Sequence, residues 1–255
     1  MRNAWIICRK ELGSYFVSPI AYLLLAVFAF IFGYFFWTAV KFFVFEGMEM
    51  QMRGQTFPMS LNEQIIRPLL GNVGVIGLFL IPLITMRLFA EEKRTGTIEL
   101  LATSPVRDLE IIMGKWLAAL LLYCSLLLFT ALNFAFLFRY GNPDWKPLLV
   151  GYLGLLLQAG SLLAIGTFIS SVTKNQIVAG AATFAVCLLL YVSGWVSSFD
   201  STPWARFLAY ISVATHTDSF LRGAIDSKDA VYYLTLIFLG LFFSARSLES
   251  LRWRS

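Results

Sequence analysis

The segment LFAEEKRTGTIELLATS, residues 88–104, decides how the rest of the chain is interpreted. It is the most densely charged stretch of a strongly apolar sequence, and Pro105 follows it directly. One apolar run ends just before it, and another begins at Trp116. The pattern predicts a short polar helix at a membrane surface between two spans, where a soluble partner could push on a membrane protein.

Composition predicts an all-α integral membrane protein with a single domain, residues 1–255. The chain is 58% hydrophobic and only 14% charged, whereas soluble domains contain about 25% charged residues. The net charge is +5, but the basic residues are scattered between apolar runs. That placement indicates topology signals rather than a nucleic-acid surface. The three cysteines show no metal or disulfide spacing.

Six apolar runs have about the length that crosses a bilayer. They are residues 20–40, 71–88, 116–138, 147–172, 177–196 and 230–245. In the second run, Gly71, Gly74 and Gly77 share one side and permit close approach of a neighbouring helix, and Pro82 predicts a kink.

The segments outside the spans differ in character. Residues 1–18 carry apolar side chains at three- and four-residue steps, which predicts an amphipathic helix lying in the membrane interface. A corner is expected at Ser18-Pro19. Residues 41–67 are predicted to form a polar loop. Residues 197–229 are of intermediate polarity, and we expect a short interfacial or re-entrant helix there, too brief to span.

Charge counting orients the chain. Six spans place both termini on one side, and alternating the loops puts 12 of the 20 Lys and Arg residues on that side. The positive-inside rule therefore predicts cytoplasmic termini and a cytoplasmic segment 88–104 in the inner membrane.

No Asp, Glu, Lys, Arg or His lies in the interior of any predicted span. This argues against a proton-coupled carrier, which needs such groups at membrane depth. The single histidine, His216, is interpreted as a polar loop residue. No G-x-x-x-x-G-K-[ST] motif exists to cradle nucleotide phosphates. We therefore expect no enzymatic activity and no bound cofactor, and any driving energy must come from a partner.

Within the charged segment, Gly96 is expected to end the helix that leaves the second span. Thr95 or Thr97 can cap a further turn, residues 98–101, with an apolar patch and a charged rim. Such a patch suits a groove on another protein. An equally good interpretation is a charged loop with Ile98 and Leu101 packed back on the bundle. Ser104-Pro105 is predicted to cap the helix leading into the third span.

The sequence MRLFAEEKRTGTIELLATSP, residues 86–105, resembles the signature of the type-two class of ABC transporter permeases. The resemblance is strongest to the branch named for gliding-motility and copper-processing systems. It extends over essentially the whole chain, through residues 10–12, 18–22, 114–115, 220–226 and 247–249.

This resemblance implies a six-span permease with an N-terminal elbow helix, paired with a second copy or a paralogue. Each permease recruits a separate cytoplasmic ATPase subunit, which uses ATP and Mg. The region 89–105 is then the coupling helix that sits in a cleft of that ATPase, and residues 197–229 correspond to re-entrant extracellular helices. The implied coupling residues are Glu91, Glu92, Arg94, Gly96, Thr97, Ile98, Glu99 and Leu101.

Two functions fit these features. The first is an ATP-driven exporter, whose uncharged, aromatic-rich interior suits lipidic or amphipathic cargo but equally suits contact with membrane lipid. The second is a force-transmitting or anchoring subunit of a surface or periplasmic machine, which moves no cargo itself. Both include the ATPase dimer and allow a periplasmic partner, whose identity would distinguish them, and neither involves nucleic acid.

Overall fold

A computed structural model describes residues 2–54, 60–97, 106–196 and 202–252. All elements in these ranges are helices. They are α1 (Arg2–Val17), α2 (Pro19–Met52), the π-helical turn η1 (Asn62–Ile66), α3 (Arg67–Thr85), α4 (Ala90–Thr95), α6 (Asp108–Tyr140), α7 (Trp145–Val172), α8 (Gln176–Val192), the 3-10 turn η2 (Ser193–Trp195), α10 (Pro203–Ile211), α11 (Val213–Leu221) and α12 (Ser227–Arg252).

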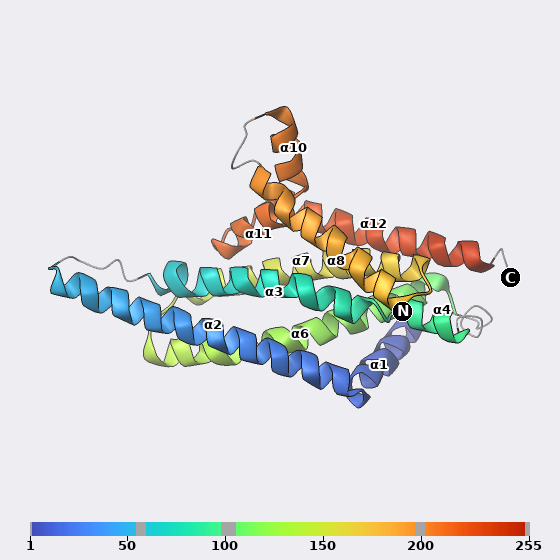
Figure 1. Ribbon diagram of the computed structural model, residues 1–255, viewed down its shortest axis with the longest axis horizontal. Helices are drawn as coiled ribbons and strands as arrows, with labels where there is room; N and C mark the ends of the chain where they lie inside the picture. The colour runs from blue at the N-terminus through green and yellow to red at the C-terminus, as the bar shows by residue number, and fades with distance from the viewer. Residues whose placement is uncertain (1, 55–59, 98–105, 197–201, 253–255) are drawn as a thin grey trace.

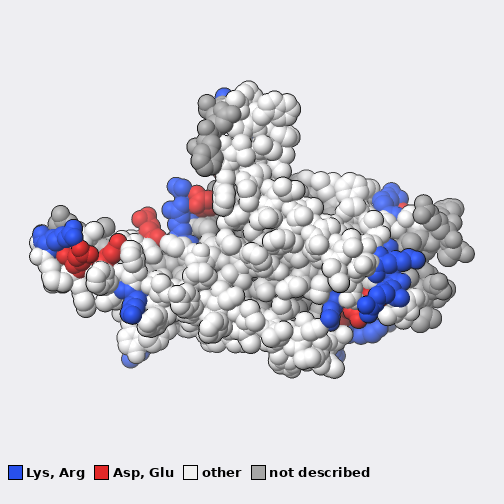
Figure 2. All heavy atoms as spheres, viewed as in Figure 1, with Lys and Arg blue, Asp and Glu red and all other residues white. Residues whose placement is uncertain are grey.

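The predicted six-span architecture is confirmed. By length and composition, six helical segments within the described residues can cross a membrane. Five of them contain a predicted apolar run in full, and Gln176–Trp195 covers the run 177–196 except for its last residue. Both ends of the chain lie at the end of the bundle that carries α4 (Figure 1). Charged side chains gather towards the two ends of the face in Figure 2, with a broad uncharged region between them. This distribution is expected of a protein whose middle faces lipid.

The corner at Ser18-Pro19 forms as predicted. Ser18 caps α2 by accepting a hydrogen bond from the Ile20 backbone N–H at 3.4 Å, and Pro19 occupies the first turn. On the other side of the corner, α1 lies against α6 (Figure 1). The approach is close at Gly114 of α6, where an added Cβ would stand 2.7 Å from the Ala4 carbonyl oxygen. The helix α1 is therefore docked on the bundle, and its role as an elbow helix in the membrane interface stays a prediction.

Two expectations about helix boundaries were wrong. Much of the predicted loop 41–67 is helical, because α2 continues to Met52 and the chain is helical again from Asn62. Residues 41–52 contain Lys, Glu, Met and Gln, which are good helix formers, and no proline. The helix leading into the third span begins at Asp108 with Arg107 at its N-cap. Ser104 and Pro105 lie outside the described residues.

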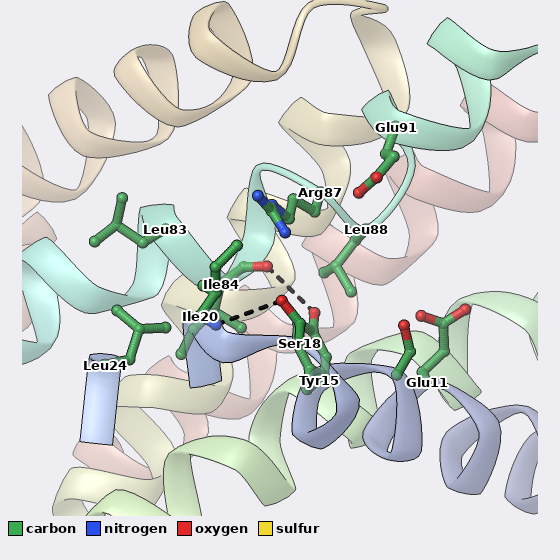
Figure 3. Close-up of a pocket in the computed structure, with 11 residues that line it drawn as sticks. Glu11, Tyr15, Ser18, Ile20, Leu24, Leu83, Ile84, Arg87, Leu88 and Glu91 are labelled. Carbon is green, nitrogen blue, oxygen red and sulfur yellow. Dashed lines mark hydrogen bonds between the residues drawn. The ribbon is translucent and has the colours of Figure 1, made fainter. Parts of the chain in front are cut away.

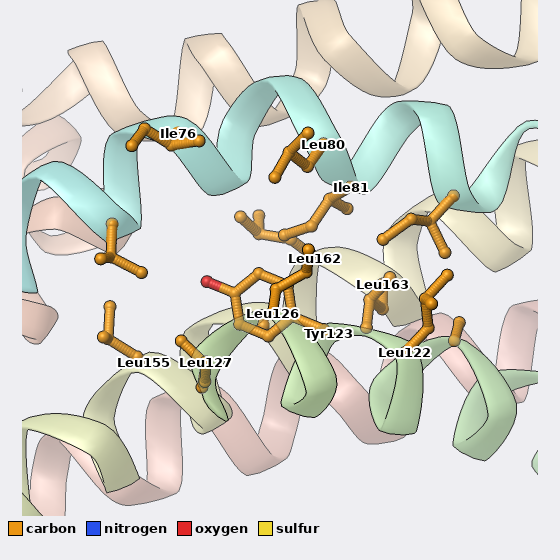
Figure 4. Packing of buried hydrophobic residues seen from close by; sticks show 14 of the residues in the cluster. Ile76, Leu80, Ile81, Leu122, Tyr123, Leu126, Leu127, Leu155, Leu162 and Leu163 are labelled. Atoms are coloured by element: carbon orange, nitrogen blue, oxygen red, sulfur yellow. The ribbon is translucent and has the colours of Figure 1, made fainter. Parts of the chain in front are cut away.

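The helices α3 and α7 form the centre of the bundle. In their apolar windows 72% and 61% of residues are buried, compared with 17% in α2, so α2 presents most of its surface outward. Leucine and isoleucine side chains from α3, α6 and α7 meet in the core, around Tyr123 (Figure 4). The close approach predicted for the α3 glycines occurs at Gly74 and Gly77, whereas a Cβ added at Gly71 would make an ordinary contact, 3.8 Å from Leu221. A Cβ added at Gly74 would lie 3.1 Å from the Gln158 side chain, and one at Gly77 would lie 3.2 Å from the Tyr123 hydroxyl.

Glycine at position 240 allows α12 to lie against α7, which gives the first test of the fold. A Cβ added there would stand 2.7 Å from the backbone carbonyl carbon of Ala164. Backbone cannot give way as a side chain can, so we expect Gly240→Ala to cost about 1–3 kcal/mol of stability. Its thermal midpoint in detergent should fall.

Gly33→Ala is the matched control, since a Cβ at Gly33 meets nothing within 4 Å. It should leave the midpoint unchanged or raise it, because alanine favours helix over glycine. Equal midpoints for the two variants would contradict the α7–α12 packing.

The region before the last span contains two short helices, α10 and α11. The helix α10 confirms that a short helix forms here, and its interfacial or re-entrant placement stays a prediction. The interpretation of His216 as a loop residue was wrong. His216 lies on α11 and is 4% exposed. Its Nδ1 is 2.6 Å from Asp229 Oδ1, and its ring stacks on Tyr232. The partner belongs to the first turn of α12, so only the tertiary fold reveals the pairing.

Candidate functional site

The short helix α4 begins where another helix supplies its N-terminal cap. The backbone N–H groups of Phe89 and Ala90 both donate to the hydroxyl oxygen of Ser170, each at 3.1 Å. Ser170 is buried near the end of α7. The first N–H groups of a helix have no partner within that helix. The Ser170 hydroxyl therefore satisfies two donors at the start of α4 and fixes this point of the chain to α7.

The end of α4 is set by Gly96, as the sequence predicts. Gly96 has φ +74°, in the left-handed region that glycine adopts without steric cost. The Thr95 hydroxyl lies 3.0 Å from the Glu91 carbonyl oxygen and 3.0 Å from the Thr97 hydroxyl. Arg94 and Thr97 are exposed. The other three predicted coupling residues, Ile98, Glu99 and Leu101, lie outside the described residues.

The side chain of Lys115 links three helices, α1, α4 and α6. Its Nζ lies 2.8 Å from Glu11 Oε1 on α1 and 2.8 Å from Glu92 Oε1 on α4, while Lys115 itself belongs to α6. The lysine side chain is 3% exposed, and the two glutamates are about one-fifth exposed. The ammonium also lies 5.3 Å from the centroid of the Phe89 ring. We call Glu11, Glu92 and Lys115 the lysine cluster.

Burial makes the lysine cluster an obligatory set of contacts. A buried ammonium without partners costs several kcal/mol, so Lys115 depends on both carboxylates. The two glutamates depend on Lys115 in turn, because each carboxylate gives up part of its hydration to contact the ammonium. Glu92 Oε2 is buried and has no hydrogen-bond partner among the described residues. The cluster therefore connects the position of α4 to the positions of α1 and α6.

A further link runs from α4 to the end of α7. Lys93 donates a hydrogen bond from Nζ to the Ser171 carbonyl oxygen, which also accepts from the Ser247 hydroxyl of α12 at 2.9 Å. The last carbonyls of a helix carry partial negative charge and attract cations. Together with the Ser170 cap, this contact attaches α4 to α7 at both of its ends.

Sequence reasoning identified α4 but missed what holds it. Lys115 appeared only as the residue opening the third span, and Ser170 and Glu11 were not singled out. One signal in the sequence could have drawn attention to Lys115. The lysine directly precedes Trp116, the first residue of a predicted span, and a charge at the end of an apolar run can be buried. No pattern in the sequence indicates that its partners come from α1 and α4.

The described side chains around α4 make structural contacts between helices. No group of three or more His, Cys, Asp or Glu side chains that could hold a metal occurs within the described residues. The site instead has an exposed outer surface, with Arg94 and Thr97, and an inner surface attached to three helices. A displacement of α4 must move those helices or break these contacts.

Comparisons with known proteins identify the family of the chain. Residues 5–200 match the sequence profile of the ABC-2 family transporter proteins. The chain is 26% identical over 209 residues, 81% of its length, to the probable multidrug ABC transporter permease YbhS of Escherichia coli strain K12. It is also 26% identical over 169 residues, 65% of its length, to the probable multidrug ABC transporter permease YbhR of that strain. The matches cover 54% and 44% of these proteins. The chain thus spans about half the length of the curated relatives it matches.

Proposed function

Because this chain belongs to the ABC-2 family of transporter proteins, we propose that it is the membrane-spanning permease subunit of an ATP-driven exporter. A separate cytoplasmic ATPase subunit supplies the energy, and the segment 89–105 receives its movement. The attachment of α4 to α1, α6 and α7 is the observation that carries this proposal. A helix attached in this way passes a push from a soluble partner directly to the spans.

The proposed working unit contains two ATPase subunits and two permeases, the second being another copy or a paralogue. ATP and Mg bind to the ATPase subunits and not to this chain. Movement of α4 first displaces α6 and α7, the helices that contact it through Lys115 and Ser170. These helices also pack on α3 and α12, so the movement spreads across the bundle. A path for cargo then opens or closes between the two permeases.

Export is favoured over force transmission. The relatives YbhS and YbhR are described as probable multidrug permeases, which supports small amphipathic cargo for this chain as well. A force-transmitting subunit of the gliding-motility type would need an attached periplasmic machine. Recovery of such a machine with the complex, without transport, would identify that alternative.

The direct test is to purify the chain from its native membranes and identify what accompanies it. We expect an ATP-binding subunit in the complex and ATP hydrolysis by that complex. The chain purified alone should hydrolyse no ATP, because it lacks a phosphate-binding loop. ATP hydrolysis that persists in the single chain, after every other protein has been removed, would contradict the proposal.

The proposed location is the inner membrane, with α4 and both termini in the cytoplasm. Single cysteines at Arg94 and Ala224 test it, because both positions are exposed and belong to opposite ends of spans. The background must lack Cys8, Cys124 and Cys187. In intact cells, a membrane-impermeant thiol reagent should label the cysteine at 224 and spare the one at 94. The reverse pattern would mean that the orientation is inverted.

A further inference from the structure

A cavity of about 260 Å³ lies where the α1–α2 corner meets the end of α3 and the start of α4. Figure 3 shows Arg87 and Glu91 projecting from the α3–α4 side towards the α1 face that carries Glu11 and Tyr15. Pockets that take drug-sized ligands measure about 300–1,000 Å³. This cavity is smaller, which suits a compact headgroup rather than a whole drug-like molecule.

The polar part of the cavity contains unpaired charges of both signs. Arg87 Nε is buried and has no hydrogen-bond partner among the described residues. Within the described ranges, no ion pair joins Arg87 or Glu91 to another side chain. Glu11 uses one carboxylate oxygen to bind Lys115. Arg87 and Glu91 are both half-buried. A charge that has lost part of its water favours an opposite charge beside it, so a guanidinium and a carboxylate that share one cavity without an ion pair offer partners to a ligand that carries both signs.

The opposite wall of the cavity is apolar. Leu24 and Leu83 line it, and Leu83 is 43% exposed on the outer surface of α3. Both leucines belong to helices long and apolar enough to span a membrane. The cavity therefore connects charged groups at the end of the bundle with a surface suited to acyl chains, the arrangement that an intact lipid requires.

We propose that this cavity binds the headgroup of a phospholipid that carries a primary amine, with its phosphate at Arg87 and its ammonium at Glu91 and Glu11. A guanidinium presents a planar set of donors that matches phosphate oxygens. A primary ammonium donates hydrogen bonds to carboxylates, which a quaternary ammonium cannot do. A headgroup with net negative charge meets two carboxylates and only one cation at the site. Phosphatidylethanolamine carries a phosphate, carries a primary ammonium and has no net negative charge, so it meets all three conditions.

Tyr15 contributes a neutral wall to the site. Burial, together with the neighbouring Glu11 carboxylate, raises the pKa of Tyr15 above its ordinary value. The phenol therefore stays protonated and donates to the Ile84 carbonyl oxygen at 3.3 Å. This bond ties α1 to α3 beside Arg87, so a bound headgroup would rest between two helices that are already joined.

The test uses the full chain, delipidated in mild detergent, and native mass spectrometry. Equimolar phosphatidylethanolamine, phosphatidylcholine and phosphatidylglycerol with identical acyl chains compete for the protein. We expect the ethanolamine lipid to be retained about tenfold over each of the others, the effect of one hydrogen bond to a charged group. Equal retention of the three lipids would overturn the proposal.

Two variants test which side chain binds the phosphate and which binds the ammonium of the headgroup. Glu91→Gln should remove most of the preference for phosphatidylethanolamine over phosphatidylcholine, because it removes the carboxylate that has no ion pair of its own, while Glu11 is already bound to Lys115. Arg87→Gln should lower retention of all three lipids, because each carries the phosphate. Should Arg87→Gln fail to fold, judged by its thermal midpoint without lipid, the selectivity of Glu91→Gln decides alone. Unchanged selectivity in Glu91→Gln would overturn the assignment.

Matched controls remove the same charges elsewhere. Arg9→Gln changes an exposed residue of α1, and Glu249→Gln changes a residue of α12; neither lines the cavity. Both should retain the wild-type preference, and loss of it in either would indicate general surface charge instead of a site. Soluble glycerophosphoethanolamine should not displace the lipid at equal concentration. Displacement would mean that a soluble phosphoamine, and not a lipid, is the ligand. The isolated chain suffices for these assays, so their outcome is independent of ATPase coupling.

Discussion

Lys115→Met is expected to release α4 from the bundle. The substitution leaves Glu11 and Glu92, each about one-fifth exposed, facing each other without the cation that both contact at 2.8 Å. Removing one partner of a buried ion pair costs about 3–5 kcal/mol. At 1.4 kcal/mol per decade, the population of the opened form rises roughly a hundredfold or more. Hydrogen exchange of the amides in α4 should accelerate by a corresponding factor, with a much smaller change in α7.

A neutral triple variant separates the effect of charge from that of packing. Glu11→Gln, Glu92→Gln and Lys115→Met together remove all three charges and keep the side-chain sizes similar. Replacing a buried ionic set by uncharged residues is often close to neutral. We therefore expect slow exchange in α4 to return in the triple variant. If the triple variant exchanges as fast as Lys115→Met alone, the lysine contributes through packing and the lysine cluster has no electrostatic role.

The second large effect is expected at the proposed contact with the ATPase. Leu101 lies outside the described residues, so this prediction rests on its place in the sequence, between Gly96 and Pro105 and outside the apolar runs. If Leu101 sits in a groove of the partner, Leu101→Asp buries an unpaired carboxylate there. The loss is about 2–4 kcal/mol, or about thirty- to a thousandfold in affinity. Recovery of the ATPase with the tagged permease should fall accordingly.

Gly74→Leu is the comparison for Leu101→Asp. Gly74 is buried in α3 against the Gln158 side chain, so a large residue there should lower membrane yield first. The permease that does fold should still bind the ATPase. Leu101→Asp should show the opposite pattern, with normal yield and weak partner recovery. Poor yield with normal partner binding for Leu101→Asp would make Leu101 a bundle-packing residue instead.

The spans could be predicted because they depend on local composition. A run of apolar residues long enough to cross a bilayer can be recognised from the sequence of that run alone, and each predicted run overlaps one helical segment that is long and apolar enough to span. The corner at Ser18-Pro19 and the end of α4 at Gly96 are equally local, since one capping hydroxyl and one left-handed glycine determine them. The extension of α2 to Met52 was missed because polarity between residues 41 and 52 was interpreted as a loop.

The contacts that hold α4 could not be predicted, because their partners are distant in sequence. Lys115 is separated from Glu11 by 104 positions, and Phe89 from Ser170 by 81. Periodicity and spacing assign residues to helix faces but do not say which faces meet. His216 and Asp229 show the same limit at the opposite side of the fold, where a residue in a polar stretch is buried against the next helix.

The central claim is that the segment starting with α4 receives the movement of a separate ATPase. A photo-crosslinking amino acid at Arg94, which is exposed on α4, tests it directly. Illumination of the intact complex should produce a covalent adduct with the ATP-binding subunit, and its yield should change when ATP is added. The same probe at Arg222, exposed at the end of α11, should give no such adduct. An intact complex in which Arg94 never crosslinks to the ATPase, while Arg222 does, would contradict the account.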